Sequence, residues 1–207
     1  MTRVVLASTS PRRSELIAAL GVAFAVQPAD VSEATVERDP VRVAEGLALR
    51  KARAVAELLA GEDVVIGSDT VVAVDGRILG KPADAEEARA MLAALRARDH
   101  EVVTGVAVIA RGRAAADHSR TAVRMRAYAD AEVDAYVATG SPFDKAGGYA
   151  IQDEAFHPVE RCDGCECGVI GLPLWTLRRL LRVAADVHAE APALARCARC
   201  PLRARDG

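Results

Sequence analysis

The chain has 207 residues and a formal net charge of -2 at pH 7, with 51% hydrophobic and 3% aromatic residues. Its length allows one substantial core or two lobes that share a sheet, while the small net charge argues against a general nucleic-acid binder and the scarcity of aromatic residues argues against a base-stacking surface. Because the sequence contains no apolar run of membrane-spanning length and no signal-peptide pattern, we expect a cytoplasmic protein with neither nucleic acid nor membrane as a partner.

Short strands alternate with amphipathic helices along most of the chain, which predicts a mixed α/β architecture. In chain order we expect a strand at residues 4–7, a helix at 11–20, a strand at 23–26, a polar loop at 27–40, a helix at 41–59, strands at 64–74 and 77–79 joined by an Asp75-Gly76 turn, a helix at 84–95, strands at 101–110 and 114–128, a helix at 130–138, a glycine-rich loop at 146–149 and a last helix from Pro173. From about residue 190 onward the chain shows no periodicity.

The first helix begins with two arginines, a position where helix electrostatics disfavours cations. Hydroxyl residues follow the first strand, Pro11 suits the first helical position, and Arg12 and Arg13 lie in the first turn beside free backbone N–H groups. A strand, a hydroxyl-rich turn, a helix N-terminus and paired guanidinium groups together make a phosphate-binding site. The alternative is a well-capped surface helix whose arginines are solvated.

Two charged residues occupy positions that the hydrophobic pattern marks as buried. Lys51 lies on the apolar stripe of the long helix, between Leu47 and Val55. It either extends along its stem to solvent or meets an anion. Asp69 lies inside the apolar run 64–74, where an ionised carboxylate needs a metal, a cation or several hydrogen bonds. A structural role for Asp69, as a helix cap or the partner of a buried arginine, is the alternative to a role in chemistry.

Further polar residues stand in turns and loops. Lys81 follows the hairpin, Asp144-Lys145 precedes the flexible Gly147-Gly148 pair, and Gln152 offers both a donor and an acceptor to a base edge. Each also has an ordinary reading as a turn, surface or strand residue. Taken together, many cations and few embedded acids indicate a polyphosphate ligand with a divalent metal between it and the carboxylates.

The ordered set of motifs resembles the Maf family of nucleoside triphosphate pyrophosphatases from about residue 3 to residue 181. The segments that carry this resemblance are 6–13 (LASTSPRR), Glu33, 51–52 (KA), 68–72 (SDTVV), 80–82 (GKP), 100–106 (HEVVTGV), 144–152 (DKAGGYAIQ) and 171–174 (GLPL). Each motif is weak alone, but their order along the chain is specific. The resemblance implies a Maf/ITPase-like two-lobed α/β fold around an elongated mixed sheet with a central cleft, and a homodimer.

The resemblance also implies a reaction. Family members hydrolyse a nucleoside triphosphate to the monophosphate and pyrophosphate with Mg²⁺ or Mn²⁺, and water attacks the α-phosphorus. Asp69 matches the proton acceptor and Glu33 matches an acid near the metal, so both are expected as ligands of the divalent metal together with substrate phosphates. The expected substrate-binding residues are Ser8, Arg13, Lys51, Lys81 and Lys145.

Three further residues match positions that the family uses to distinguish the base of the nucleotide. Arg12, Thr70 and Gln152 resemble the branch of the family that acts on dTTP and UTP, whereas the branch acting on 7-methyl-GTP typically has an aromatic residue at the position of Arg12. We therefore expect dTTP, UTP and modified pyrimidine nucleotides as substrates, in a role that removes non-standard nucleotides from the pool. Two alternatives stay open: a non-catalytic nucleotide-binding regulator of cell division, and a pyrophosphatase with shifted specificity, for example for 7-methyl-GTP.

All five cysteines fall in the last quarter of the chain, where the segment 162–170 departs from the family pattern. An odd count without an export signal does not indicate a disulfide framework. Cys162 and Cys165 have the same two-residue separation as Cys197 and Cys200, which suits a structural zinc site that ties the tail to the body. The alternative is unpaired, reduced cysteines. We divide the chain into a Maf-like domain at 1–188 and a peripheral cysteine-containing tail at 189–207.

Overall fold

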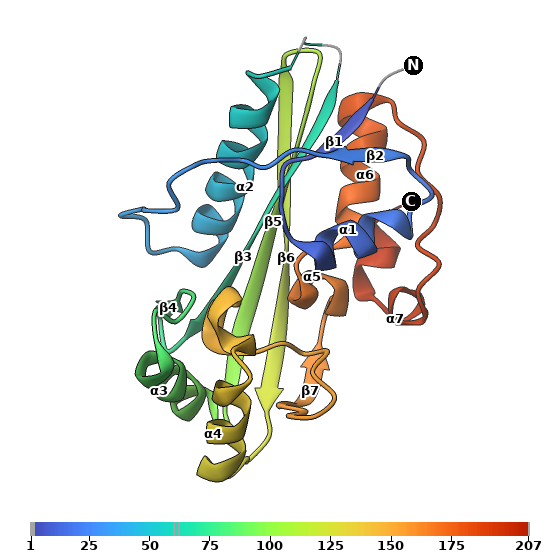
Figure 1. The fold of residues 1–207 in the computed structure, drawn as a ribbon. Helices are drawn as coiled ribbons and strands as arrows, with labels where there is room; N and C mark the ends of the chain where they lie inside the picture. The colour runs from blue at the N-terminus through green and yellow to red at the C-terminus, as the bar shows by residue number, and fades with distance from the viewer. Residues whose placement is uncertain (1–2, 60, 62, 207) are drawn as a thin grey trace.

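The computed structural model describes residues 3–59, 61 and 63–206, and its framework is an elongated mixed β-sheet (Figure 1). Among these residues the strands lie in the order β2-β1-β3-β5-β6-β7, with β4 paired to β3. β1 pairs in parallel with β2 and β3, and the other described pairs are antiparallel. The strands are β1 (Val4–Leu6), β2 (Phe24–Val26), β3 (Val64–Val74), β4 (Arg77–Leu79), β5 (Asp99–Ala110), β6 (Arg113–Met125) and β7 (Val159–Asp163).

Helices cover both faces of the sheet (Figure 1). α2 packs on β3 and β5, α6 packs on β5 and β6 from the other face, and α3 packs with α4 at the far end. The helices are α1 (Pro11–Ala18), α2 (Pro40–Ala56), α3 (Ala85–Leu95), α4 (Asp130–Ala138), α5 (Glu166–Ile170), α6 (Leu174–Ala185) and α7 (Ala195–Ala198), with 3-10 helices η1 (Ser141–Asp144), η2 (Ala146–Gly148) and η3 (Pro201–Arg205). The predicted mixed α/β fold is confirmed.

Alternate side chains of the central strands build separate cores on the two faces. Val64 and Ile66 of β3 join a cluster with α1 and α6, which we call the α6 core, whereas Val65 joins a cluster with Ala48 and Val55 of α2. This division follows from the two-residue period of a strand. A further cluster, the α3 core, lies around α3 and α4 at the other end of the sheet. Two lobes thus share the long strands β3, β5 and β6.

One edge of β3 is open at its middle. β1 pairs with β3 over Val64–Ile66 and β4 pairs with it over Val72–Val74, so residues 67–71 face no strand on that side among the described residues. β5 pairs with the same stretch on the opposite side. The middle of a long central strand is therefore accessible from the space between the two lobes.

Two glycines let α2 approach the sheet closely. A Cβ on Gly67 would lie 2.1 Å from the carbonyl oxygen of Ala48, and one on Gly105 would lie 2.4 Å from the backbone of α2. Atoms do not tolerate such distances, so a side chain at either glycine would push α2 away. This approach places Lys51, about one turn beyond Ala48, over Asp69, which lies two residues beyond Gly67 on the same face of β3.

Most predicted elements are confirmed within a few residues. The strand at 64–74 and the helix at 130–138 match β3 and α4, and Asp75 and Gly76 have φ angles of 49° and 73°, typical of a tight hairpin turn. The predicted strand end at residue 128 is wrong, since β6 ends at Met125. The sequence analysis did not predict β7 or α5, because both are short and lie in a segment without a clear period.

The tail predicted to be peripheral, of which residue 207 lies outside the described part, is only partly so. Ala189, Cys197 and Cys200 are buried in the α6 core. The indole Nε1 of Trp175 donates to the carbonyl oxygen of Cys197 at 3.0 Å. The apolar residues of the tail are too few and too irregularly spaced to show a period, yet these three are buried in the α6 core.

Within the described part of the chain, no helix has the length and apolarity needed to cross a membrane. The cytoplasmic location, the homodimer and the lack of a nucleic-acid partner stay predictions. The division into a domain at 1–188 and a tail also stays a prediction.

We expect Gly105→Ala to lower the free energy of unfolding by about 1–3 kcal/mol, because the new methyl group would push α2 off β5. Gly46→Ala is the matched control, since Gly46 is an exposed residue of α2 whose Cβ would meet nothing within 4 Å. We expect this control to gain up to about 1 kcal/mol from helix propensity. Urea unfolding measures both variants, and equal stability of the two would contradict the close packing of α2.

Candidate active site

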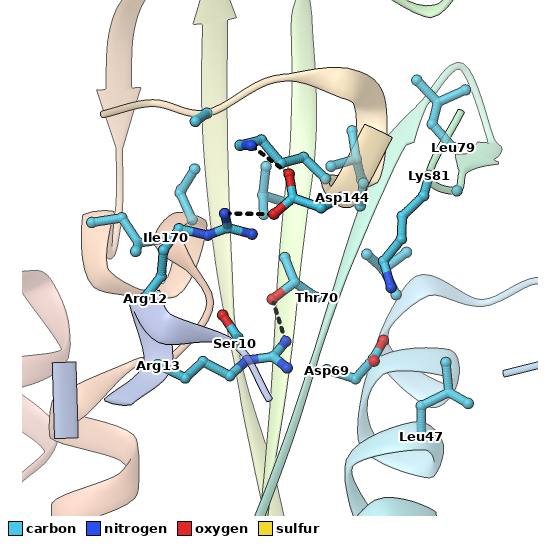
Figure 2. Close-up of a pocket in the computed structure, with 18 of the residues that line it drawn as sticks. Ser10, Arg12, Arg13, Leu47, Asp69, Thr70, Leu79, Lys81, Asp144 and Ile170 are labelled. Carbon is cyan, nitrogen blue, oxygen red and sulfur yellow. Dashed lines mark hydrogen bonds and ion pairs between the residues drawn. The ribbon is translucent and has the colours of Figure 1, made fainter. Parts of the chain in front are cut away.

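A cavity of about 580 Å³ lies between the two lobes, at the open edge of β3. Side chains from the start of α1, from β3, from the segment after β4 and from η1 point toward it (Figure 2). The predicted site residues that line the cavity are Ser8, Arg12, Arg13, Glu33, Asp69, Thr70, Lys81, Lys145 and Gln152. The tenth, Lys51, reaches the cavity through its ion pairs with two of these acids.

The ammonium group of Lys51 lies between two carboxylates. Its Nζ donates to Asp69 Oδ1 at 2.5 Å and to Glu33 Oε1 at 2.6 Å. The side chains of Lys51 and Asp69 are 11% and 10% exposed, whereas that of Glu33 is 46% exposed. Lys81 approaches the other Glu33 oxygen at 3.7 Å. Lys51 therefore meets anions instead of reaching to solvent, and the buried partner of Asp69 is a lysine.

The two carboxylates have pKa values that shift in opposite directions. Burial raises the pKa of Asp69, although the charge and hydrogen bond of Lys51 act against this rise. Burial also acts to raise the pKa of Glu33, but the hydrogen bond and charge of Lys51, with the charges of Lys81 and Arg13, together outweigh burial and lower it. Asp69 is therefore the easier of the two to protonate, a division that suits an acid–base group beside a permanently charged one.

The N-terminus of α1 faces the cavity without a side-chain cap. Arg13 lies there, with Nη1 donating to Ser8 Oγ at 3.2 Å and Nε donating to the carbonyl oxygen of Gly171 at 2.9 Å. Its Nη2 donates to Thr70 Oγ1 at 3.5 Å. Figure 2 draws this contact between Arg13 and Thr70. A fixed guanidinium group beside free helical N–H groups favours an anion at this point.

Asp144 connects Arg12 and Lys145 at the opposite side of the cavity. Arg12 Nη1 donates to Asp144 Oδ2 at 3.0 Å (Figure 2). Lys145 Nζ donates to Asp144 Oδ1 at 2.5 Å. Because Arg12 belongs to α1 and Asp144 to η1, this bridge joins the two lobes. The sequence analysis placed Asp144 in a loop and gave it no partner, since no local pattern shows one 132 positions away.

Tyr149 lines the cavity, and the side chain of His100, which does not line it, contacts Tyr149. The Tyr149 hydroxyl and His100 Nε2 are 2.6 Å apart, and the two rings meet edge to face with centroids 5.4 Å apart. Burial lowers the pKa of His100 to about 4, so its ring is neutral at neutral pH. The sequence analysis missed this pair, although a histidine at the start of an apolar strand is a signal for it.

The residues at Lys51 fit a divalent metal. Glu33 and Asp69 both line the cavity, and each contacts the Lys51 ammonium group through only one of its two carboxylate oxygens. Oxygen donors from carboxylates and phosphates are those that Mg²⁺ and Mn²⁺ prefer. A second group of potential ligands, formed by Glu45, Asp117 and His118, lies outside the cavity. There Arg179 already pairs with the Asp117 carboxylate.

The structure does not gather the four cysteines predicted as zinc ligands. Cys162 of β7 packs against the α3 core, whereas Cys165, Cys197 and Cys200 lie with Cys167 in the α6 core. Within the described chain, no three sulfur atoms lie within 4.8 Å of one another. The predicted set is not gathered because Cys162 packs on the α3 core, whereas the other thiols pack in the α6 core, a difference that the cysteine spacing alone does not reveal.

Comparison with known proteins identifies a family and several relatives that this chain resembles. Residues 3–184 match a family model described as Maf-like protein. A dTTP/UTP pyrophosphatase of Thermomicrobium roseum is 50% identical, covering 96% of this chain and 93% of the relative. Another, from Citrifermentans bemidjiense, is 48% identical, covering 87% of this chain and 94% of the relative. A nucleoside-triphosphatase / dITP/XTP pyrophosphatase structure from Mycobacterium abscessus covers 61% of this chain and 76% of its own at 21% identity, but its TM-score of 0.41 is too low to bear on fold or function.

We expect Lys51→Met to lower the free energy of unfolding by about 3 kcal/mol, because Asp69 would become a buried carboxylate without its partner. Adding Asp69→Asn should restore part of the loss, since the uncompensated charge is removed. Arg89→Met is the control, because it breaks an exposed ion pair with Asp134 and should cost less than about 1 kcal/mol. Urea unfolding tests all three, and a Lys51→Met loss no larger than that of the control would contradict a buried pair.

We expect the His100–Tyr149 pair to make stability depend on pH. The folded-state pKa of His100 lies below the unfolded value, so its contribution is fully present above the unfolded pKa and falls as pH drops toward about 4. From about pH 7.5 to about pH 5, wild type should lose roughly 2 kcal/mol more than His100→Gln. Urea unfolding at the two pH values measures the difference, and identical losses would show that His100 titrates normally.

Proposed function

The chain belongs to the Maf family, and on this premise we propose that it hydrolyses dTTP, UTP and modified pyrimidine nucleotides to the nucleoside monophosphate and pyrophosphate. Relatives named dTTP/UTP pyrophosphatase, at 48–50% identity over most of the chain, support the reaction. The observation that carries the proposal is the buried Lys51–Asp69 pair, which lies at a cavity lined by several further cations. Such a cavity suits the charge of a polyphosphate.

Asp69 is the proton acceptor in this proposal. Burial raises its pKa, so it takes up a proton more readily than an exposed aspartate, while Lys51 fixes its Oδ1. A water molecule hydrogen-bonded to the carboxylate gives its proton to Asp69 as its oxygen bonds to the α-phosphorus. The bond from the α-phosphorus to the bridging oxygen breaks at the same centre, and pyrophosphate leaves with that oxygen and its electron pair.

The cations around the cavity stabilise the charge that develops on the leaving pyrophosphate. Arg13 is positioned for this by Ser8 and Gly171 before substrate arrives, so little reorganisation is needed. Lys81, whose side chain is 54% exposed, is free to turn from Glu33 to an outer phosphate. Lys145 lies on the other side of the cavity and offers a further positive charge.

Glu33 and Asp69 would hold the divalent cation together with phosphate oxygens. When bound, Mg²⁺ or Mn²⁺ supplies charge neutralisation and orients the triphosphate. The lowered pKa of Glu33 keeps this carboxylate ionised at neutral pH, which suits a ligand. Lys51 orients both carboxylates and limits the net negative charge between them.

Arg12, Thr70 and Gln152 would read the pyrimidine. All three line the cavity, and the amide of Gln152 can donate and accept at a base edge. Asp144 fixes the guanidinium of Arg12, and Thr104 Oγ1 lies 3.0 Å from Thr70 Oγ1. A methylated cationic purine would favour an aromatic face, which an arginine at position 12 does not offer.

Pyrophosphate release from dTTP, UTP, CTP, GTP and 7-methyl-GTP, with Mg²⁺ or Mn²⁺, tests the proposal. We expect dTTP and UTP to be preferred, and Asp69→Asn to lower kcat by about 10²–10⁴-fold because the proton acceptor is lost. Asp134→Asn is the matched control, since it makes the same chemical change at an exposed ion pair with Arg89. This control should retain wild-type turnover.

The possible results distinguish the proposed reaction, the proposed base specificity and the non-catalytic alternative. Preference for another nucleotide would keep the reaction and contradict the assignment of Arg12, Thr70 and Gln152. Full turnover by Asp69→Asn would contradict the proposed mechanism. Nucleotide binding by wild type without any release would instead favour the non-catalytic regulator of cell division.

A further inference from the structure

Four buried thiols lie where the tail packs against α5, and none of them lines the cavity described above. Cys165 caps the start of α5 and Cys167 lies within it, while Cys197 lies in α7 and Cys200 directly precedes η3. All four are 6% exposed or less and belong to the α6 core. An ion pair at 2.5 Å between Arg196 of α7 and Glu166 of α5 joins the same two elements.

The thiols are arranged as pairs. Cys167 Sγ and Cys197 Sγ are 3.4 Å apart, in direct contact. Cys165 and Cys200 form a second pair, joined by a hydrogen bond between their thiols, and the Cys165 sulfur also accepts a hydrogen bond from the backbone N–H of Gly168 at 3.3 Å. In a tetrahedral metal site all four sulfurs would be close neighbours, yet the described chain contains no set of three within 4.8 Å. Pairwise chemistry therefore fits these positions better than a shared metal.

We propose that Cys167 and Cys197 form a redox modification site, a reversible disulfide that ties the tail to α5. The two residues come from elements already held together by Arg196–Glu166 and by the bond from Trp175 to Cys197. The sulfurs are already in contact, and closing the bond would shorten their separation from 3.4 Å to about 2.05 Å. This proposal does not depend on the reaction proposed for the cavity.

The oxidant belongs to the class of peroxides, with hydrogen peroxide as the simplest member. Hydrogen bonds from the partner thiols lower the pKa of Cys197 and lower that of Cys200 to about 7, which favours both thiolates. We place the first step at Cys197, because its sulfur is the one in contact with Cys167. The thiolate sulfur attacks one peroxide oxygen, hydroxide leaves and takes up a proton to form water, and Cys197 becomes a sulfenic acid. Cys167 then attacks that sulfur, the S–O bond breaks, and a second water leaves with the proton of Cys167. Two thiols are oxidised and one peroxide is reduced.

The bond would lie next to the turn that orients Arg13. The carbonyl oxygen of Cys167 accepts hydrogen bonds from the backbone N–H groups of Gly171 at 3.0 Å and Leu172 at 2.9 Å. The carbonyl oxygen of Gly171 in turn receives Arg13 Nε. A cross-link to α7 would restrict the opening of this turn together with the tail, so we expect oxidation to raise Tm by about 5–10 °C.

Peptide mapping of the full chain tests the proposal. Reduced wild type is treated with hydrogen peroxide, its remaining thiols are alkylated, and it is cut with trypsin and a glutamate-specific protease. Cleavage after Glu166 separates Cys167 from Cys165, and cleavage after Arg196 and Arg199 separates Cys197 from Cys200. We expect the Cys167 peptide linked to the Cys197 peptide, and the link and the rise in Tm should both disappear on treatment with dithiothreitol.

Cys197→Ser should abolish the link and the rise in Tm. Cys162→Ser should keep both, because Cys162 is a half-buried thiol outside the α6 core. If Cys197→Ser fails to fold, peptide mapping of the wild type still shows whether the Cys167–Cys197 link forms. A different pairing, the absence of any link, or an unchanged Tm on oxidation would overturn the proposal. So would about one zinc ion per purified chain whose removal by a chelator lowers Tm, since this outcome would assign the thiols to a metal.

Discussion

The ammonium group of Lys51, buried between the carboxylates of Asp69 and Glu33, is the interaction on which the rest of the site depends. An ionised carboxylate in the middle of a central strand would cost several kcal/mol without such a partner. With the lysine in place, one cation faces two anions, and the remaining negative charge lies beside a cavity lined by arginine and lysine side chains. This balance suits a triphosphate accompanied by a divalent cation.

A single stretch of β3 organises both sides of the cavity. Asp69 faces α2, which Gly67 and Gly105 admit close to the sheet. Its neighbour Ser68 points to the opposite face, where its hydroxyl donates to the carbonyl oxygen of Gly171 at 2.9 Å, the same oxygen that receives Arg13. The two-residue period of the strand thus lets one face of β3 carry Asp69 while the other face supports the turn that holds Arg13. Because β1 and β4 leave the strand edge open between them, both groups reach the same space.

Charged residues in apolar surroundings could be predicted from the sequence, whereas pairs of residues that make long-range contacts could not. Lys51 on an apolar stripe and Asp69 in an apolar run were visible because burial of an unpaired charge is costly, whatever its partner. The partnership of Arg12 with Asp144 and the contact of Cys167 with Cys197 were not visible, because each depends on tertiary packing of distant segments. Short elements such as β7 and α5 also escaped prediction, since a few residues cannot establish a period.

The central claim is that water, activated at Asp69, attacks the α-phosphorus. Hydrolysis of dTTP in water labelled with a heavy oxygen isotope, followed by mass spectrometry of both products, tests this claim most directly. The account predicts that one labelled oxygen enters the nucleoside monophosphate and none enters pyrophosphate. Label in pyrophosphate would mean that water attacks the β-phosphorus, and release of inorganic phosphate in place of pyrophosphate would mean attack at the γ-phosphorus. Either result would contradict the positions that we propose for Asp69 and the cations around it.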